Sequence, residues 1–276
     1  MVILLQCSDR VGLVADISAV MAAANLNIIS MKEYVNTDEN RFYVRLEIQG
    51  NTDLEQLQLQ IKSKLPADTE ISLRPYAKKK VAVLVTKEHH CIGDILLRNH
   101  FNTLDAEVQC VIGNYDTLQS LTEKFEIPFH HIPHEGKEKH VFEQQIVATL
   151  NQYELDYIIL AKFMRILSPE FVAKYSSRII NIHHSFLPAF IGAHPYRQAH
   201  ERGVKLIGAT AHFVTNVLDD GPIIAQRTIA VNHTHTVKDM IRLGREIEKS
   251  ALANGMELVF QDKVLVYHNK TIVFEN

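Results

Sequence analysis

The residue types best suited to chemistry stand at the end of a predicted strand over residues 178–182, where Asn181 and His183 flank Ile182. Residues i and i+2 of a strand share a face, so the amide and the imidazole project together while Ile182 points into the packing on the other side. A polar pair leaving a buried apolar strand is expensive unless it is used or satisfied. Taken alone, such a pair is more often a satisfied core pair than a catalytic one.

A carboxylate follows further along the chain. The sequence predicts a strand over 206–215, a loop over 216–222 that holds Asp219, and a return strand over 223–231. The loop is rich in turn formers, so Asp219 alone fits a cap or a solvated loop charge better than a catalytic group. Together, however, an amide N–H can stabilise an oxyanion, an imidazole can donate a proton, and a carboxylate can orient the imidazole or act as a base.

Composition bounds the setting of these groups. The 276 residues are 46% hydrophobic, enough for about two domains with buried cores. With 29 basic and 32 acidic residues and no basic run longer than residues 78–80, the chain lacks the footprint of a nucleic-acid or membrane-surface partner. Cys7, Cys91 and Cys110 form no CxxC, and the N-terminus has no signal-peptide pattern. We therefore expect a soluble, cytoplasmic protein with reduced thiols.

Histidine is frequent and glycine is scarce, with 15 and 11 residues respectively. No GxG occurs, so the dinucleotide-binding fingerprint is absent, and the spaced glycines Gly203 and Gly208 are followed by Ala-Thr where a P-loop needs Lys-Ser/Thr. The pairs at 89–90 and 130–131 and the residues His233 and His235 lack metal-site spacing, so surface or pocket-lining roles suit them better and no metal is expected. His184 and His212 suit orienting or packing roles.

The first part of the chain predicts a small α+β domain. A turn at residues 8–12, in which Ser8 or Asp9 would cap the following helix, separates the first strand from the first helix. The predicted order is βαββαβ, with strands at 2–7, 28–35, 41–49 and 70–74 and helices at 13–24 and 53–65. The polar stretch at residues 75–80 then reads as a linker.

The remainder alternates strand and helix. It opens on an apolar strand at 81–85, of the kind that is buried on both faces of a parallel sheet. Further strands are predicted at 106–112, 129–132, 157–161 and 178–182, with helices at 92–99, 118–125, 138–153 and 169–175. This order predicts a doubly wound α/β sheet whose ligand sites lie at the carboxyl ends of the strands.

Residues 7–15, Cys-Ser-Asp-Arg-Val-Gly-Leu-Val-Ala, resemble the strand-turn-helix start of an ACT domain, a ferredoxin-like module. That resemblance implies regulation by an amino acid, with glycine and methionine as candidate effectors, and side-by-side pairing into a homo-oligomer. An α+β sandwich used only for oligomerisation is the alternative. The implied division is an ACT-like domain over 1–76 and a catalytic domain over 77–276.

The second part resembles the fold of enzymes that use formyltetrahydrofolate. The similarity is carried by Asn181-Ile-His183, Leu187-Pro188 and the runs 160–167, 208–214 and 218–226, in this order and spacing. It implies a catalytic trio of Asn181, His183 and Asp219. It also implies a folate pocket formed by Phe163, Met164, Arg165, Ile166, Leu167, His184, Asp220 and Gly221, and leaves the roles of His194 and Arg197 open.

An ACT-like domain ahead of this fold is similar to the formyltetrahydrofolate deformylase family. The expected reaction is hydrolysis of 10-formyltetrahydrofolate to tetrahydrofolate and formate without a cofactor, which supplies formate for purine synthesis and balances one-carbon folate pools. Formyl transfer to an amine is the alternative, and a catalytically silent amino-acid sensor is a third. The loop over residues 86–94 has one glycine and two acids and is poorly suited to a phosphate-bearing amine, so we expect water as the acceptor.

Overall fold

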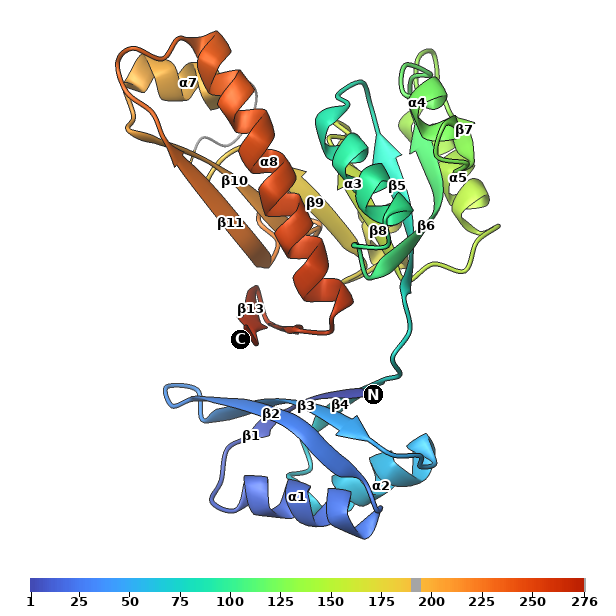
Figure 1. The fold of residues 1–276 in the computed structure, drawn as a ribbon, viewed down its shortest axis with the longest axis vertical. Coiled ribbons are helices and arrows are strands. Elements are labelled where there is room, and N and C mark those ends of the chain that lie inside the picture. The colour runs from blue at the N-terminus through green and yellow to red at the C-terminus, as the bar shows by residue number, and fades with distance from the viewer. Residues whose placement is uncertain (190–194, 276) are drawn as a thin grey trace. The chain divides into compact units, whose positions relative to one another are not determined.

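The computed structural model describes residues 1–189 and 195–275, and it divides into two compact units. Unit 1 comprises Met1–Ala77 with two short C-terminal pieces, Asp262–Leu265 and the stretch from Ile272. Unit 2 comprises Lys78–Gln261 and Val266–Thr271. The predicted α/β class, with a small sheet domain before a mostly parallel one, is confirmed (Figure 1).

Unit 1 has the predicted βαββαβ order. An antiparallel sheet in the order β2-β3-β1-β4 carries both helices on one face (Figure 1). Its elements are β1 (Val2–Ser8), α1 (Leu13–Ala23), β2 (Asn27–Asn36), β3 (Arg41–Gln49), α2 (Leu54–Lys64) and β4 (Glu70–Arg74). Ile3, Leu5, Ile17, Leu46 and Ile61 belong to the hydrophobic core that the strands and helices share.

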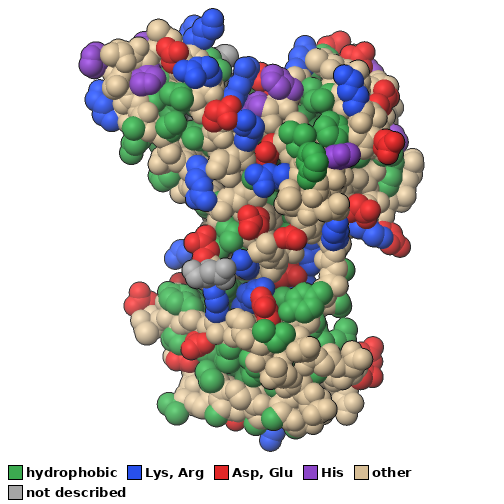
Figure 2. All heavy atoms as spheres, in the orientation of Figure 1, with side chains coloured by type: hydrophobic (Ala, Val, Ile, Leu, Met, Phe, Trp, Pro, Cys, Tyr) green, Lys and Arg blue, Asp and Glu red, His purple; other side chains and the backbone are tan. Residues whose placement is uncertain are grey.

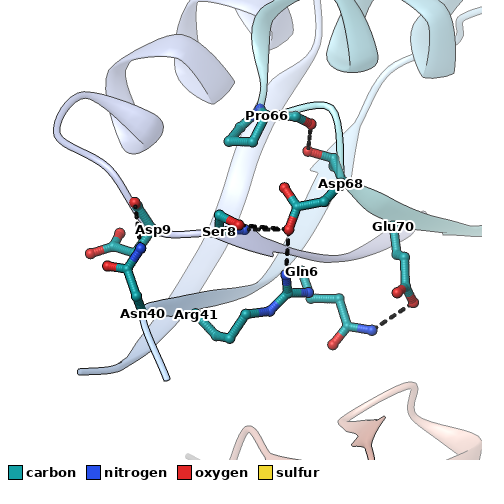
Figure 3. A network of polar contacts seen from close by, with 9 residues as sticks. Gln6, Ser8, Asp9, Asn40, Arg41, Pro66, Asp68 and Glu70 are labelled. Carbon is teal, nitrogen blue, oxygen red and sulfur yellow. Dashed lines mark hydrogen bonds and ion pairs between the residues drawn. The ribbon is translucent and has the colours of Figure 1, made fainter. Parts of the chain in front are cut away.

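The expected side-chain cap of α1 is wrong. Gly12 is the N-cap, with φ of 91° and no side-chain cap bond. Ser8 instead stays in β1, where its amide and its hydroxyl both donate to Asp68 Oδ2, at 3.0 and 2.7 Å, and Arg41 pairs with the same oxygen (Figure 3). The turn chemistry was misassigned because the partner of Ser8 lies 60 residues away in the chain.

Unit 2 is built on a seven-stranded sheet in the order β11-β10-β9-β8-β5-β6-β7. Strands β5 to β9 are parallel, and β10 pairs antiparallel with both β9 and β11. The strands are β5 (Lys79–Val85), β6 (Ala106–Gly113), β7 (Phe129–His131), β8 (Tyr157–Ala161), β9 (Ile179–His183), β10 (Leu206–Phe213) and β11 (Ile223–Ala230), and a hairpin β12 (Val264–Tyr267) and β13 (Lys270–Val273) follows.

Helices cover both faces of this sheet. Apolar side chains of α5 and α6 pack on alternate residues of β5, β6 and β8, while α3 and α8 lie in front of the sheet in Figure 1 and pack on one another. The helices are α3 (His90–His100), α4 (Gln119–Glu123), α5 (Lys139–Leu150), α6 (Pro169–Lys174), α7 (Pro195–Arg202) and α8 (Val237–Phe260). The sequence analysis did not predict α7, α8 or the final hairpin.

The surface carries both signs of charge. Figure 2 shows Lys and Arg interspersed with Asp and Glu over the face drawn, without an extended area of one sign. Within the described residues no helix is long and apolar enough to cross a membrane.

The Asp68 contacts predict an acid-sensitive contribution to stability. The hydrogen bond from the Ser8 hydroxyl, aided by the Ser8 amide and Arg41, holds the pKa of Asp68 below its ordinary value. A depressed folded-state pKa gives stability that is present above the unfolded-state pKa and is lost as the pH falls through the folded one. Thermal unfolding should therefore show the wild type losing its advantage over Asp68→Asn below about pH 4. Asp38→Asn, in the exposed β2–β3 turn, should leave the pH dependence unchanged.

Candidate active site

The structure brings Asn181, His183 and Asp219 together at one edge of the unit 2 sheet. β9 carries Asn181 and His183, and the loop between β10 and β11 carries Asp219. His183 Nδ1 lies 3.2 Å from Asp219 Oδ1, and the imidazole and carboxylate are 6% and 12% exposed. This contact fixes the ring orientation and places a proton on Nδ1. His183 Nε2 is buried without a hydrogen-bond partner among the described residues.

His212 holds the amide of Asn181. The two residues are opposite each other in the antiparallel β9–β10 pair, and Asn181 Nδ2 lies 3.1 Å from His212 Nε2. His212 Nδ1 lies 2.8 Å from the Phe213 carbonyl oxygen, which can only accept, so the proton is on Nδ1 and Nε2 accepts from Asn181. Burial lowers the pKa of His212, which keeps the ring neutral in this role. One amide N–H of Asn181 therefore remains for a ligand.

The charge on Asp219 is maintained by its neighbours. Burial opposes ionisation, but the hydrogen bond from His183 and the nearby imidazoles outweigh it, so the pKa of Asp219 lies below its ordinary value. Asp219 has a positive φ of 55°, a conformation that Asp adopts more readily than most residues. Its Oδ2 makes no hydrogen bond to any other residue that the structure describes. The carboxylate therefore has one oxygen committed to His183 and one available.

Gly221 lets the Asp219 loop close on β10. A Cβ at this position would lie 1.8 Å from the Phe213 carbonyl oxygen, and the Phe213 amide donates to the Pro222 carbonyl at 2.9 Å. Any side chain at residue 221 would therefore push the loop away from the strand. The family resemblance implied a pocket role for Gly221. The structure shows a separate requirement for glycine here, the close approach of the loop backbone to β10.

The segment after His183 is fixed from β10 and β11. The hydroxyl of Thr210, which is fully buried, donates to the Ser185 carbonyl at 2.8 Å and accepts from the Leu187 amide at 3.1 Å. Gln226 Nε2 lies 3.0 Å from both the Thr210 hydroxyl and the Leu187 carbonyl. These contacts hold the backbone that leaves β9, and the Leu187–Pro188 peptide bond in it is cis.

The other predicted pocket residues divide by exposure. Phe163 is 1% exposed and stacks on Phe142, so its side chain belongs to the core. Its backbone carbonyl accepts a hydrogen bond from the Thr86 hydroxyl. Met164 and Ile166 are 59% and 62% exposed, which is unusual for apolar side chains beside polar groups. Arg165 and Asp220 are exposed, whereas Leu167 is half-buried and His184 is partly buried beside His183. Arg197 lies exposed on α7, and His194 lies outside the described residues.

A second polar group was missed by the sequence analysis. His90, Lys162, Tyr196 and Glu248, which we call the Glu248 cluster, come from α3, the end of β8, α7 and α8. Glu248 is 1% exposed on the buried face of α8. The sequence signal for this cluster is Glu248, a charged residue among the apolar residues of one face of α8. It could not be recognised because α8 itself was not predicted.

His90, Cys91 and Glu248 could offer ligand atoms to a metal, since these atoms lie within 4.8 Å of one another. The Lys162 ammonium, however, is 3.2 Å from Glu248 Oε2 and would oppose a dication. Burial also raises the pKa of the Cys91 thiol, away from the thiolate that metals bind. The donor set therefore fits an internal ion pair better than a metal site.

Comparison with known proteins places these features in a family. The ACT domain pattern matches residues 1–65 and the formyl transferase pattern matches residues 79–256. The chain is 46% identical to the formyltetrahydrofolate deformylase of Haemophilus influenzae, over 99% of this chain and 98% of that protein. The chain belongs to the formyltetrahydrofolate deformylase family. A further member, from Escherichia coli strain K12, is 47% identical over 97% of the chain and 95% of its own length.

Solved structures agree with this membership. A deformylase of this family from Pseudomonas syringae pv. tomato matches with a TM-score of 0.92 and 38% identity, over 99% of this chain and 94% of that one. Glycinamide ribonucleotide transformylase 1 from Symbiobacterium toebii matches with a TM-score of 0.69 and 26% identity, over 73% of this chain and 96% of that one. The transformylase therefore shares only part of the chain, whereas the family member spans nearly all of it.

The close approach at Gly221 yields a prediction. Gly221→Ala should displace the loop, separate Asp219 from His183 and lower the midpoint of thermal unfolding. A crystal structure of the variant would report the Asp219–His183 distance directly. Gly93→Ala is the matched control, because a Cβ on that α3 glycine meets nothing within 4 Å and alanine favours a helix by about 1 kcal/mol. An unchanged Asp219–His183 contact in Gly221→Ala would contradict the assigned role.

Proposed function

We propose that the protein hydrolyses 10-formyltetrahydrofolate to tetrahydrofolate and formate, and thereby supplies formate for purine synthesis and balances one-carbon folate pools. The observation that carries the proposal is the His183–Asp219 contact beside the oriented amide of Asn181. Relatives named formyltetrahydrofolate deformylase that match almost the whole chain support it. The chemistry needs no cofactor.

In the proposed reaction, Asn181 stabilises the oxyanion. Water attacks the formyl carbon, a new C–O bond forms and the carbonyl electron pair moves to oxygen. The amide N–H of Asn181 that is not bound to His212 donates to this oxygen. Because His212 fixes which way the amide points, the donor is in place before the charge develops and no reorganisation is needed.

His183 and Asp219 divide the proton transfers. Asp219 accepts a proton from the attacking water through the oxygen that His183 does not occupy, and it orients the ring through the other. When the carbonyl re-forms, the C–N10 bond breaks and the His183 imidazolium protonates N10. The substrate thus gains one hydrogen on N10. The two protons that came from water then leave Asp219 and formic acid; one restores the His183 imidazolium and the other is released with formate.

Water suits the site better than an amine as the acceptor. A phosphate-bearing amine would need free backbone N–H groups after β5, and helix N-termini with glycine-rich loops usually provide them. Here α3 starts at His90, whose ring is buried against the Glu248 carboxylate, with the Glu88 carboxylate 3.6 Å from its other nitrogen. The segment 86–89 that leads into α3 contains no glycine, so it lacks the loop that usually binds a phosphate. The partial match to a transformylase keeps formyl transfer as the second candidate.

The folate is proposed to lie against the loops after β8 and β10. The exposed Met164 and Ile166 offer apolar contacts, with the Phe163 backbone, Arg165 and Leu167 beside them. His184, Asp220 and Gly221 complete the proposed pocket. The exposed positions of Met164 and Ile166 support this assignment, because a planar aromatic ligand would cover them.

Unit 1 is proposed to regulate and to pair. Its match to ACT domains supports binding of a small amino acid, with glycine and methionine as the candidates. Strand β2 is 10 residues long and lies at an edge of the sheet, with Ile29 56% exposed, which supports association with a second copy. Amino-acid binding and pairing are separate properties, and calorimetry and sedimentation would test them independently.

The proposed function predicts formate release from 10-formyltetrahydrofolate with no amine present. A transferase would need an added amine, and an amino-acid sensor would release nothing under either condition. Assay of both free formate and tetrahydrofolate, with and without glycinamide ribonucleotide, separates the three, because a transferase would form tetrahydrofolate only with the amine and would pass the formyl group to it without releasing formate. Tetrahydrofolate that forms only in the presence of the amine, or the absence of formate under both conditions, would refute hydrolysis.

Single substitutions test the catalytic roles. Loss of one oxyanion donor typically costs about 10²–10³ in kcat, so Asn181→Ala should fall in that range while unfolding at nearly the wild-type temperature. Asp219→Asn should be at least as severe, because it keeps the shape and removes the base. Asn151→Ala, at an exposed position after α5, is the control and should keep full turnover. Near wild-type turnover of Asn181→Ala would show that the oxyanion is stabilised elsewhere.

A further inference from the structure

The Glu248 carboxylate gathers three donors inside unit 2. Its Oε2 lies 2.8 Å from His90 Nε2 and 3.2 Å from Lys162 Nζ, and its Oε1 accepts from the Tyr196 hydroxyl at 2.6 Å. Burial opposes the charge, yet the hydrogen bond from His90 and the Lys162 ammonium outweigh it and hold the pKa of Glu248 well below its ordinary value. The carboxylate is therefore ionised, and Lys162, 8% exposed, is its countercharge.

Stability alone does not account for this cluster. A buried ion pair contributes little net stability, because desolvation of both charges offsets their attraction, and apolar residues of similar size often serve as well. The fold nevertheless makes room for it. Gly244, one turn before Glu248 on α8, would place a Cβ 2.2 Å from the Tyr196 ring and hydroxyl. Glycine destabilises a helix interior relative to alanine, so Gly244 costs helix stability and in return leaves room for Tyr196 to pack against α8.

The cluster adjoins the catalytic strand end. Lys162 follows β8 and His184 follows β9, and these strands are parallel neighbours, so both residues stand at the same edge of the sheet. The His184 ring lies between those of His183 and Tyr196, with centroids 5.2 and 6.2 Å away. The charged and titratable groups that act on His184 come from five elements and are Lys162, His183, Tyr196, Asp219 and Glu248.

His184 has capacity to bind a small polar molecule. Its ring nitrogens make no hydrogen bond to another residue that the structure describes. Burial, and next the Lys162 ammonium, lower the pKa of His184 to about 4. A ring with this pKa is neutral at physiological pH and offers one acceptor and one donor nitrogen. A neutral acceptor next to His183 and Asp219 suits a water molecule and not an anion.

We propose that the Glu248 cluster is a positioning device that holds His184 as a neutral imidazole beside His183, where it accepts a hydrogen bond from the attacking water. The water molecule then donates a hydrogen bond to His184 and transfers its other hydrogen to Asp219 as a proton. These two contacts direct the lone pair of the water oxygen to the formyl carbon. Lys162 and Tyr196 act through His184 and not on the substrate. This inference rests on the proposed hydrolysis and deepens it by assigning the nucleophile's site.

Tyr196→Phe is the mildest test, because it removes one hydrogen bond to Glu248 and keeps the ring beside His184. Misplacement of a reacting group by about 1 Å costs up to about 10²-fold, so kcat should fall between about 10-fold and 10²-fold while KM for the folate stays within about twofold. The matched control is Tyr175→Phe, since that buried hydroxyl has no hydrogen-bond partner among the described residues. It should change neither parameter.

Lys162→Met tests the charge. Removal of the ammonium leaves His184 facing Glu248, so the pKa of His184 should rise and the acid limb of the kcat–pH profile should move to higher pH. Because an unpaired Glu248 carboxylate could unfold the protein, the double variant Lys162→Met/Glu248→Gln keeps the cluster neutral and should show a smaller shift of the same sign. NMR titration of ¹³C-labelled histidines, with His184→Gln for assignment, measures the change without reference to turnover.

The outcomes separate this inference from the proposed function. Unchanged kcat in Tyr196→Phe, or an unmoved His184 titration in both Lys162 variants, would overturn the positioning role. A fall in activity that only tracks the midpoint of thermal unfolding, with an unmoved pH profile, would also overturn it and leave the cluster structural. If the wild type releases no formate, hydrolysis itself fails, while the His184 titration still reports whether Lys162 acts on that ring.

Discussion

The antiparallel pairing of β9 with β10 is the constraint on which the rest of the site depends. The strands before β10 in the large sheet run parallel to one another, and β10 is the first that pairs antiparallel, with β9. The reversal places His212 opposite Asn181 and Thr210 opposite His183. The loop that follows β10 then carries Asp219 to His183, the last residue of β9. A shift of this pairing by one residue would turn every one of these side chains to the other face.

Burial gives the polar groups of this edge their properties. In a poorly solvated site an unpaired charge or amide is costly, so each group needs a defined partner and holds a defined state. His212 is neutral because burial lowers its pKa and outweighs the hydrogen bond to the Phe213 carbonyl, and this neutrality leaves Nε2 to accept from the Asn181 amide. Asp219 is charged because its neighbours, chiefly through the hydrogen bond from His183, outweigh the effect of its burial. The charge state of each buried group therefore depends on its hydrogen-bond partner as well as on its burial.

The sequence predicted the features that depend on local pattern. Strand periodicity located β9 and put Asn181 and His183 on one face, and turn chemistry located the Asp219 loop. The Asn181–His212 bond could not be predicted, because it depends on the register of two strands that are 31 residues apart. The cap of α1 was mistaken for the same reason, since the partner of Ser8 comes from a distant loop. The Glu248 cluster joins four elements, two of which had not been predicted, so no local pattern contained it.

The start of α3 connects the fold to the choice of acceptor. A helix N-terminus carries a partial positive charge and unpaired N–H groups, which is why it commonly binds phosphate. In this protein the buried Glu248 carboxylate and the half-buried Glu88 carboxylate both approach His90, the first residue of α3, and Arg245 pairs with Glu88 at 3.0 Å. Both carboxylates contact the side chain of His90, and each also pairs with a cation, Lys162 or Arg245. Water is favoured as the acceptor because the segment 86–89 that leads into α3 contains no glycine, and so lacks the glycine-rich loop that usually presents N–H groups to a phosphate.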